Sequence, residues 1–391
     1  MNVARQLFQL LASGGPAPSH RAEMWEQILA FADRTHLTLH LRGTPGLAQL
    51  VEQQIEERYS KNAARRRRLV ERFHEIADGF SLRGIPYVLL KGFTHETGFG
   101  LKPGSRAQSD LDFLVSPEDK LRATESLKAL GYRPHGPANL SAEHGRPWVR
   151  PFTWSWRGDY FDPDMPIPVE LHDSVWSPAG DRIQCVGVEE FWNRRTVMEV
   201  AGVDVPAFQE EDRITFAALH ALRHILRNDA RPAHVYELAC LLGGGLRPAL
   251  GFNQAGRSEA KASRGLKPAL RLIAFRFAHE WFGCPIPQAV AEQFEMLPEA
   301  IRSWFKDFAW SPIENLSRPN KDVLWLHLSL LESRSDRWRV AANRLLPLRI
   351  PHERPDARLR YHASALLSAL HEGARWWWSR TASSTASQTS D

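Results

Sequence analysis

The chain has 391 residues, of which 43% are hydrophobic and 24% are charged, and its formal net charge is +5. This composition is typical of globular proteins, and the length suffices for two or three domains or one elaborated domain. No stretch approaches the roughly 18 uninterrupted apolar residues of a membrane span. The N-terminus lacks the layout of a signal peptide, so we expect a cytoplasmic protein.

Residues 1–80 are predicted to be mostly helical, with helices near 4–11, 22–33 and 47–80. The third of these contains four consecutive arginines at 65–68, followed by an apolar stripe. Four successive side chains point around a helix and not along one face. We therefore interpret them as a solvated helical surface, with docking to nucleic acid as the alternative.

The first predicted strand is the apolar run from Tyr87 to Leu90. Lys91 and Gly92 end it, and a glycine there permits a tight turn or the close approach of backbone to a ligand. The stretch from Gly92 to Asp110 is expected to include a flexible loop. Its glycines and proline are Gly98, Gly100, Pro103 and Gly104.

The most informative stretch is S-D-L-D-F-L-V at 109–115. Side chains at i and i+2 of a strand point to the same face, so Asp110 and Asp112 would project together while Leu111 and Phe113 enter the core. Two adjacent carboxylates repel each other unless a cation lies between them. Mg²⁺ suits this arrangement because it binds through a few carboxylates and substrate phosphates. Two acids on a solvated strand edge are the alternative.

Two further elements are predicted downstream of this pair. Ser116 begins a helix that runs to residue 130 and stops at Gly131. The alternation of P-I-P-V-E-L-H at 166–172 predicts another strand, on which Glu170 and His172 share a face. This strand would supply a third carboxylate beside an imidazole.

Bulky side chains alternate from Trp148 to Trp156 and predict either a strand that lines a binding cleft or an exposed hairpin that leads into the strand of Glu170. Aromatic side chains can stack on nucleobases, but packing is the favoured interpretation. Asp162 and Asp164 lie in F-D-P-D-M-P, where turn chemistry explains them without a metal.

Beyond about residue 205 the pattern is predominantly helical. The clearest predicted helices are 211–227, 234–242, 268–282, 288–294 and 323–331. Glycines at 243–245 indicate a turn or hinge. The segment 359–378 ends in three tryptophans at 376–378 and could contact a membrane surface, a partner or the protein itself. The tail 381–391 is expected to be disordered.

The cysteines and histidines of the sequence do not show the spacings that are typical of metal-binding motifs. Cys185, Cys240 and Cys284 lie far apart and are interpreted as small hydrophobic residues, not as disulfides or a zinc site. Among 16 histidines, the nearest approach to a ligand pair is His220 with His224, which would share a helix face. Helix packing is the favoured interpretation of this pair and metal binding the alternative.

Taken together, these segments resemble the nucleotidyltransferase superfamily that includes polymerase beta and, more narrowly, a poorly characterised bacterial nucleotidyltransferase family. The matching elements are Leu89-Leu90-Lys91-Gly92, Arg106, Ser109 to Val115, and Glu170-Leu171-His172. L-H-A-L-R-H at 219–224 and Y-E-L at 236–238 resemble the same family's helical region. The chain departs from the superfamily at Lys91-Gly92-Phe93, where Gly-Ser or Gly-Gly is usual, and Glu237 stands where the narrower family often has aspartate.

The resemblance implies an α+β fold in which a small mixed sheet forms a nucleotidyltransferase core. We expect a helical N-terminal region at 1–80, the core at 81–204, a helical C-terminal domain at 205–350, and a basic aromatic extension at 351–380. The implied reaction is transfer of a nucleoside monophosphate from an NTP such as ATP to an acceptor, with release of pyrophosphate. The implied cofactor is Mg²⁺, as two ions, with Mn²⁺ as a substitute.

The resemblance also implies roles for individual residues. Metal binding and catalysis fall to Asp110, Asp112 and Glu170, with Glu170 alternatively the general base. Nucleotide binding falls to Lys91, Gly92, Arg106 and Ser109, and the candidates for acceptor contacts are His172 and His95. The acceptor could be a small molecule, a protein or RNA. Two alternatives stay open, namely a catalytically degenerate binding protein of this fold and a basic nucleic-acid-binding protein.

Overall fold

The computed structural model describes residues 2–99, 101–102, 104–136, 145–200, 202–243, 268–286, 288–316 and 320–345. Several predictions lie outside these ranges. They are the loop residues Gly100 and Pro103, the turn residues Gly244 and Gly245, the aromatic segment 359–378 and the tail 381–391.

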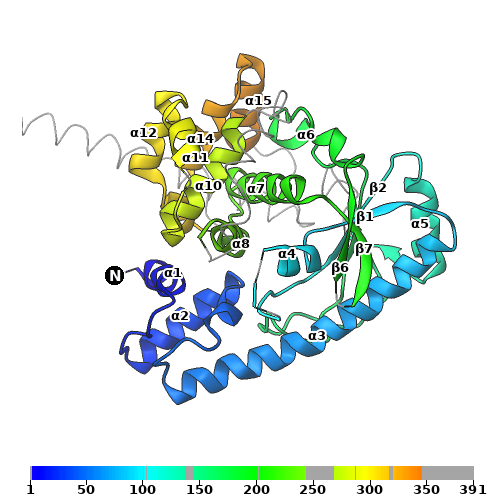
Figure 1. Ribbon diagram of the computed structural model, residues 1–391, viewed down its shortest axis with the longest axis horizontal. Coiled ribbons are helices and arrows are strands. Elements are labelled where there is room, and N and C mark those ends of the chain that lie inside the picture. Colours follow the sequence, from blue (N-terminus) through cyan, green and yellow to red (C-terminus); the bar gives the residue numbers. More distant parts are fainter. Residues whose placement is uncertain are drawn as a thin grey trace, which may run out of the picture.

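Two sheets and the helices around them make up the fold (Figure 1). The five-stranded sheet has the order β1-β2-β5-β4-β3, and β6 and β7 form a separate antiparallel hairpin. The strands are β1 Tyr87–Leu90, β2 Leu111–Val115, β3 Arg133–Pro134, β4 Trp148–Val149, β5 Val169–His172, β6 Thr196–Val200 and β7 Val203–Ala207. Strand β2 is antiparallel to β1 and parallel to β5, so the sheet is mixed, and the predicted α+β class is confirmed.

Helices precede, interrupt and follow the sheet. Before and within it lie α1 Val3–Ser13, α2 Ala22–Arg34, η1 Thr38–Leu41, α3 Gln49–Ser81, α4 Phe93–Gly98, α5 Lys120–Ala129, α6 Pro178–Asp181 and η2 Val188–Phe191. After it lie α7 Glu210–Leu226, α8 Pro232–Gly243, α10 Pro268–Phe282, α11 Gln288–Glu295, α12 Glu299–Phe308, α13 Ser311–Glu314, α14 Lys321–Leu330 and α15 Arg334–Leu345. No helix within the described ranges is long and apolar enough to cross a membrane.

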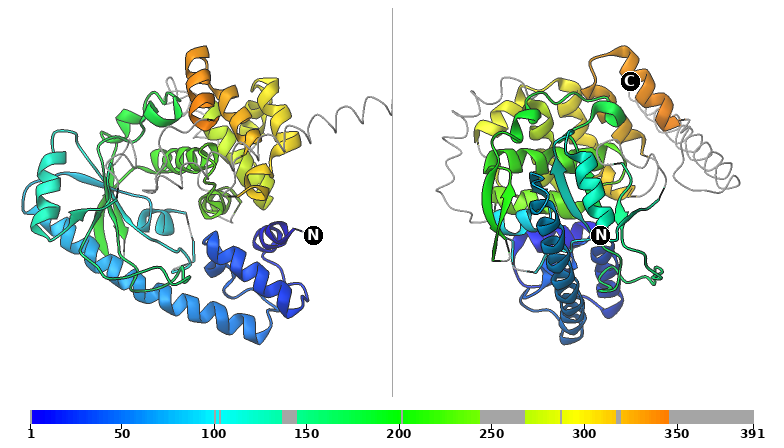
Figure 2. Two further views of the ribbon diagram at one scale, coloured as in Figure 1. Left: turned by 180° about the vertical axis from the view of Figure 1, so that it is seen from behind. Right: turned by 90° about the vertical axis from the view of Figure 1, so that its right-hand side faces the viewer.

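The sheet separates two hydrophobic cores because its side chains alternate between its faces. Leu111, Phe113 and Val115 of β2 point into the core formed with α3 and α5, as the sequence predicted, and Leu114 points into the other core. Figure 2 shows α5 and the C-terminal part of α3 on one side of the sheet, with the N- and C-terminal helices on the other.

The N-terminal helices complete the core of the C-terminal helices. Phe8 of α1 lies with its ring centroid 4.6 Å from that of Phe282 at the end of α10. From there α3 runs along the molecule to the far side of the sheet (Figure 1), where Phe73 and Phe80 pack on Phe113 with centroid distances of 6.1 and 5.5 Å. One long helix thus connects both cores.

The arginine run on α3 is only partly the solvated surface that the sequence predicted. Arg67 is exposed, but Arg65 is fully buried, and Arg66 forms an ion pair with Glu96 at 3.0 Å. Arg65 donates hydrogen bonds to four backbone carbonyls, at distances of 2.7 to 3.2 Å. The acceptors are Gln108 and Ser109, before β2, and Met165 and Pro166, before β5. Burial lowers the pKa of Arg65 to about 10, which still leaves the guanidinium charged at neutral pH.

Three predicted elements differ from the structure in extent, each for a local reason. Helix α4 occupies part of the predicted loop because the positive φ of Gly92 (56°) lets a helix begin at once. Strand β4 ends at Val149, since Pro151 cannot donate to a sheet. Helix α5 begins at Lys120, because the Ser116 hydroxyl accepts a hydrogen bond from the Asp119 amide in a preceding turn. The hairpin β6–β7 and helices α12 and α15 were not predicted.

We predict that Arg65→Met lowers the free energy of unfolding by about 3 kcal/mol or more. Four carbonyls would lose a charged donor, and each unsatisfied buried polar group costs on the order of 1–3 kcal/mol. Chemical denaturation monitored by circular dichroism would measure the change. Arg67→Met, at an exposed position on the same helix, is the matched control, with an expected change within about 0.5 kcal/mol. Equal effects of the two substitutions would contradict this account of Arg65.

Candidate functional site

The register of two parallel strands brings three polar side chains to one face of the sheet. Asp112 of β2 is paired with Glu170 of β5, and Leu114 is paired with His172. Paired residues on neighbouring strands point the same way, as do residues two apart on one strand. Asp112, Glu170 and His172 therefore all lie on the face of the sheet opposite α3 and α5, the face that Leu114 shares.

These three side chains form a compact group. Nε2 of His172 lies 3.2 Å from Oδ1 of Asp112 and 3.6 Å from Oε2 of Glu170. One ligand atom from each residue lies within 4.8 Å of the others, with Asp112 and His172 buried and Glu170 half-buried. Burial alone would lower the pKa of His172, but its hydrogen bonds to Asp112 and Glu170 outweigh that effect and raise it. Two carboxylates and an imidazole form a donor set that can hold a divalent cation.

Lys91 supplies a positive charge to the same group. Its Nζ lies 2.9 Å from Oδ1 of Asp112, and its backbone has a positive φ of 47° directly after β1. Burial would lower the pKa of Lys91, but the charges of Asp112, Asp110 and Glu170 raise it above its usual value. The lysine is therefore a permanent cation beside the carboxylates.

Gly92 holds the turn after β1 in a conformation that other residues rarely adopt. Besides its positive φ, a Cβ atom there would overlap the side-chain amide of Gln108. Nε2 of Gln108 donates a hydrogen bond of 2.7 Å to the backbone carbonyl of Asp110. The absence of a side chain at Gly92 thus lets Gln108 link this turn to the start of β2.

Asp110 and Ser109 lie just before β2 and outside the compact group. Asp110 is half-buried, and its charge acts on Lys91, but it is not among the three side chains whose ligand atoms converge. Ser109 is exposed, and its carbonyl accepts a hydrogen bond of 2.7 Å from Arg65. The two aspartates of the predicted pair therefore differ in position, because Asp112 lies within β2 and Asp110 lies just before it.

Arg106 and His95 converge on a different carboxylate, that of Glu237 on α8. Nε of Arg106 and Nδ1 of His95 each lie 2.9 Å from a separate oxygen of Glu237. Burial would raise the pKa of Glu237, but the adjacent Arg106 and His95 hold it well below its usual range. Desolvation by burial lowers the pKa of His95. Through Glu237, His95 thus connects α8 to α4, and Arg106 connects α8 to the segment before β2.

The other residues singled out in the sequence have structural partners. Asp162 accepts hydrogen bonds from Trp154 Nε1 at 2.8 Å and from the Asp164 amide at 2.9 Å, as expected of turn chemistry. Asp162 therefore has the turn contacts that the sequence indicated. Cys185, Cys240 and Cys284, all within the described residues, form no disulfide bond.

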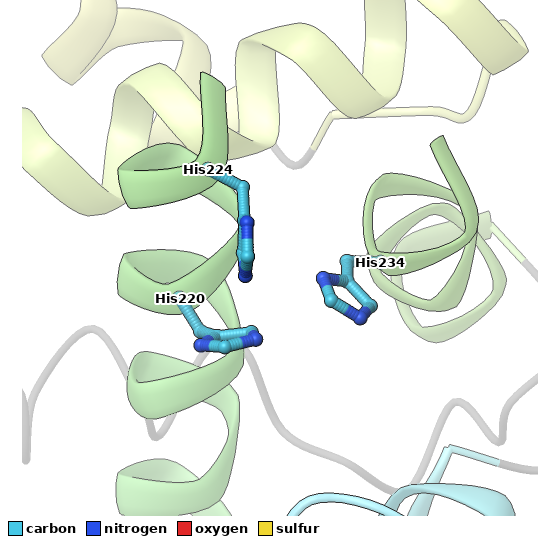
Figure 3. A group of neighbouring side chains, drawn as sticks. All are labelled: His220, His224 and His234. Carbon is cyan, nitrogen blue, oxygen red and sulfur yellow. The ribbon is translucent and has the colours of Figure 1, made fainter. Parts of the chain in front are cut away.

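Sequence reasoning missed one member of a second polar group. His234 of α8 joins His220 and His224 of α7, and the ligand atoms of all three lie within 4.8 Å of one another (Figure 3). No residue spacing identifies His234, because its position depends on how the chain turns between the two helices. Only a correct prediction of that helical hairpin would have found it.

Comparison with known proteins places the chain in a family. A solution structure of the antibiotic-resistance factor ANT(2'')-Ia is similar at 14% identity over 57% of this chain and 96% of the other, with a TM-score of 0.29, too low to establish a shared fold by itself. No curated protein matches the chain. Residues 21–283, more than half of the chain, match the family model described as "Uncharacterised nucleotidyltransferase". The chain therefore belongs to this family of uncharacterised nucleotidyltransferases.

Proposed function

We propose that the protein is a Mg²⁺-dependent nucleotidyltransferase that moves a nucleoside monophosphate from an NTP to an acceptor. The observation that carries this proposal is the convergence of Asp112, Glu170 and His172 on one sheet face beside Lys91. Membership of a nucleotidyltransferase family supports it. The acceptor could be a small molecule, a protein or RNA.

The residues present fit the metal that this reaction needs. Asp112 and Glu170 offer the carboxylate oxygens that Mg²⁺ prefers, and Asp110 could add a third carboxylate from the start of β2. An imidazole is a poorer ligand for Mg²⁺, so His172 would hold Asp112 and Glu170 in place by hydrogen bonds, or bind Mn²⁺ directly. A bound divalent ion would offset the negative charge of the triphosphate during transfer.

The chain's own residues would then perform the remaining steps. Glu170, half-buried at the edge of the group, would accept the proton of the acceptor hydroxyl if it is not itself a metal ligand. The acceptor oxygen would form a bond to the α-phosphorus while the bond from that phosphorus to the bridging oxygen breaks, and pyrophosphate would leave. Lys91, whose Nζ lies beside Asp112, would face the phosphate oxygens, and the glycine turn at Gly92 would allow the backbone close to them.

One contact favours a second candidate, a protein of this fold that binds nucleotide or a partner without turnover. The ion pair between Lys91 and Asp112 already neutralises the most buried carboxylate of the group. The basic surface that could bind nucleic acid is smaller than the arginine run suggested, because Arg65 is buried and Arg66 is paired with Glu96. Nucleotide binding without release of pyrophosphate would support the second candidate.

We predict that Asp112→Asn weakens Mg²⁺-dependent NTP binding at least about tenfold, because it removes a charged metal ligand. Isothermal titration calorimetry with each of the four NTPs, with and without Mg²⁺, would measure this effect. Asp164→Asn removes an acid whose side chain is 77% exposed, and is the matched control. Binding that is unchanged in Asp112→Asn, or no binding of any NTP to the wild type, would refute the proposed metal and nucleotide site.

We predict that Glu170→Gln lowers kcat by about 100-fold or more and changes the KM for NTP by much less. Loss of a general base typically costs about 10²–10⁴ in rate. Pyrophosphate release would be followed with sugars, proteins and RNA screened as acceptors, and with water as the default acceptor. Wild-type turnover in Glu170→Gln would remove this residue from the catalytic group. A rise in KM equal to the fall in kcat/KM would assign it to binding alone.

A further inference from the structure

Three imidazoles face one another between two helices of the C-terminal region. His220 and His224 lie on successive turns of α7, and His234 lies in the first turn of α8. Figure 3 shows the three rings directed into the same space between these helices. Their centroids are 4.6 Å apart for His220 and His224, 4.8 Å for His220 and His234, and 5.3 Å for His224 and His234.

The connection between α7 and α8 fixes this arrangement. Asn228 has a positive φ of 62°, and the amide of Asp229 donates a hydrogen bond of 2.9 Å to the carbonyl of His224. The chain therefore reverses direction within a few residues and returns His234 to the level of His220 and His224. The opposite face of α7 is anchored in the core by buried residues such as Leu222 and Ile225.

The environment of the three rings leaves one buried nitrogen atom without a partner. All are half-buried, and Nδ1 of His234 is buried without a hydrogen-bond partner among the described residues. Desolvation lowers the pKa of His220 and of His234 well below its usual value, and the charges of Lys91 and His224 lower both further. The imidazoles are therefore neutral at physiological pH, which is the form that binds metals. Buried nitrogen atoms that lack a partner are costly unless something occupies the space between them.

Asp229 provides the outer contact that metal-binding histidines commonly have. Its Oδ2 lies 3.2 Å from Nδ1 of His224, which leaves Nε2 of that ring to face a ligand. The same oxygen accepts a hydrogen bond of 3.0 Å from Arg231, which holds the carboxylate in place. The orientation of His224 is thus set from outside the group.

From this geometry we propose that His220, His224 and His234 form a binding site for a divalent transition metal of the zinc class. Three neutral imidazoles match the ligand preference of Zn²⁺, Co²⁺ and Ni²⁺, whereas Mg²⁺ prefers oxygen. A tetrahedral ion would keep one position for water or a substrate oxygen. This site is distinct from the group of Asp112, Glu170 and His172, and the inference does not depend on the proposed nucleotidyl transfer. The charge of Lys91 nevertheless acts on all three histidines, so the two groups are near neighbours.

The test is metal binding to the untagged full chain after treatment with a chelator. Zn²⁺ affinity would be measured by competition with a chromophoric chelator, and Co²⁺ would report the geometry through its visible absorption. We expect one equivalent of Zn²⁺ that stays bound in Asp112→Asn, and a loss of affinity for it of about tenfold or more in both His220→Gln and His234→Gln. Asp229→Asn, which removes only the outer contact, is expected to weaken binding by about 10–100-fold.

Two controls locate the metal. His135→Gln changes an exposed histidine outside the group and should leave Zn²⁺ affinity unchanged. Asp112→Asn, in the other group, should also leave it unchanged. The thermal midpoint of each metal-free histidine variant, compared with metal-free wild type, checks folding, and Zn²⁺ should raise the midpoint of the wild type but not of these variants. Absence of Zn²⁺ and Co²⁺ binding in the wild type would overturn the proposal, as would wild-type affinity in the histidine variants or loss of binding in Asp112→Asn alone.

Discussion

The candidate site depends on one buried guanidinium. Arg65 of α3 holds the two carbonyls that precede β2 and the two that precede β5, and so fixes where both strands begin. With the strands aligned in this way, Asp112 of β2 lies directly beside Glu170 of the parallel strand β5. A shift of one strand by a single residue would turn its side chains to the opposite face. The carboxylates would then enter the hydrophobic core under α3 and not meet each other.

The same constraint explains how a sheet can carry charge on a buried face. Leu111, Phe113 and Val115 fill one core, which leaves the alternate positions of β2 for the other side. On that side Lys91 and His172 share Oδ1 of Asp112, so the carboxylate has two partners although it is almost inaccessible to solvent. A buried charge is tolerated only when it is paired and hydrogen-bonded. The polar group is therefore part of the stability of the fold as well as a candidate for chemistry.

Local sequence patterns predicted several helices and strands. Features that depend on contacts between distant parts of the chain could not be predicted from them. Strand β1 and helix α10 have the predicted bounds, because uninterrupted apolar or periodic runs with clear ends specify them. The family resemblance was likewise confirmed by the family model that matches residues 21–283, and its strand motifs lie on β1, β2 and β5. The burial of Arg65 could not be read from its neighbours, because its acceptors lie 43 to 101 residues away. The same holds for His234, and for Arg106 and His95, whose common partner Glu237 follows more than 130 residues later.

Glu237 also limits how the molecule can move. Each of its oxygens binds a side chain from the segment between β1 and β2, while the carboxylate itself belongs to α8 of the C-terminal region. Drawing α8 away from α4 would leave a buried charge without its partners, which typically costs about 3–5 kcal/mol. A cost of that size keeps the separated arrangement below about 1% of the population, so α4 and α8 stay together in nearly all molecules at equilibrium. Moving other helices away from the sheet would cost less than moving α8 away from α4, because only the latter exposes or strands the charge of Glu237.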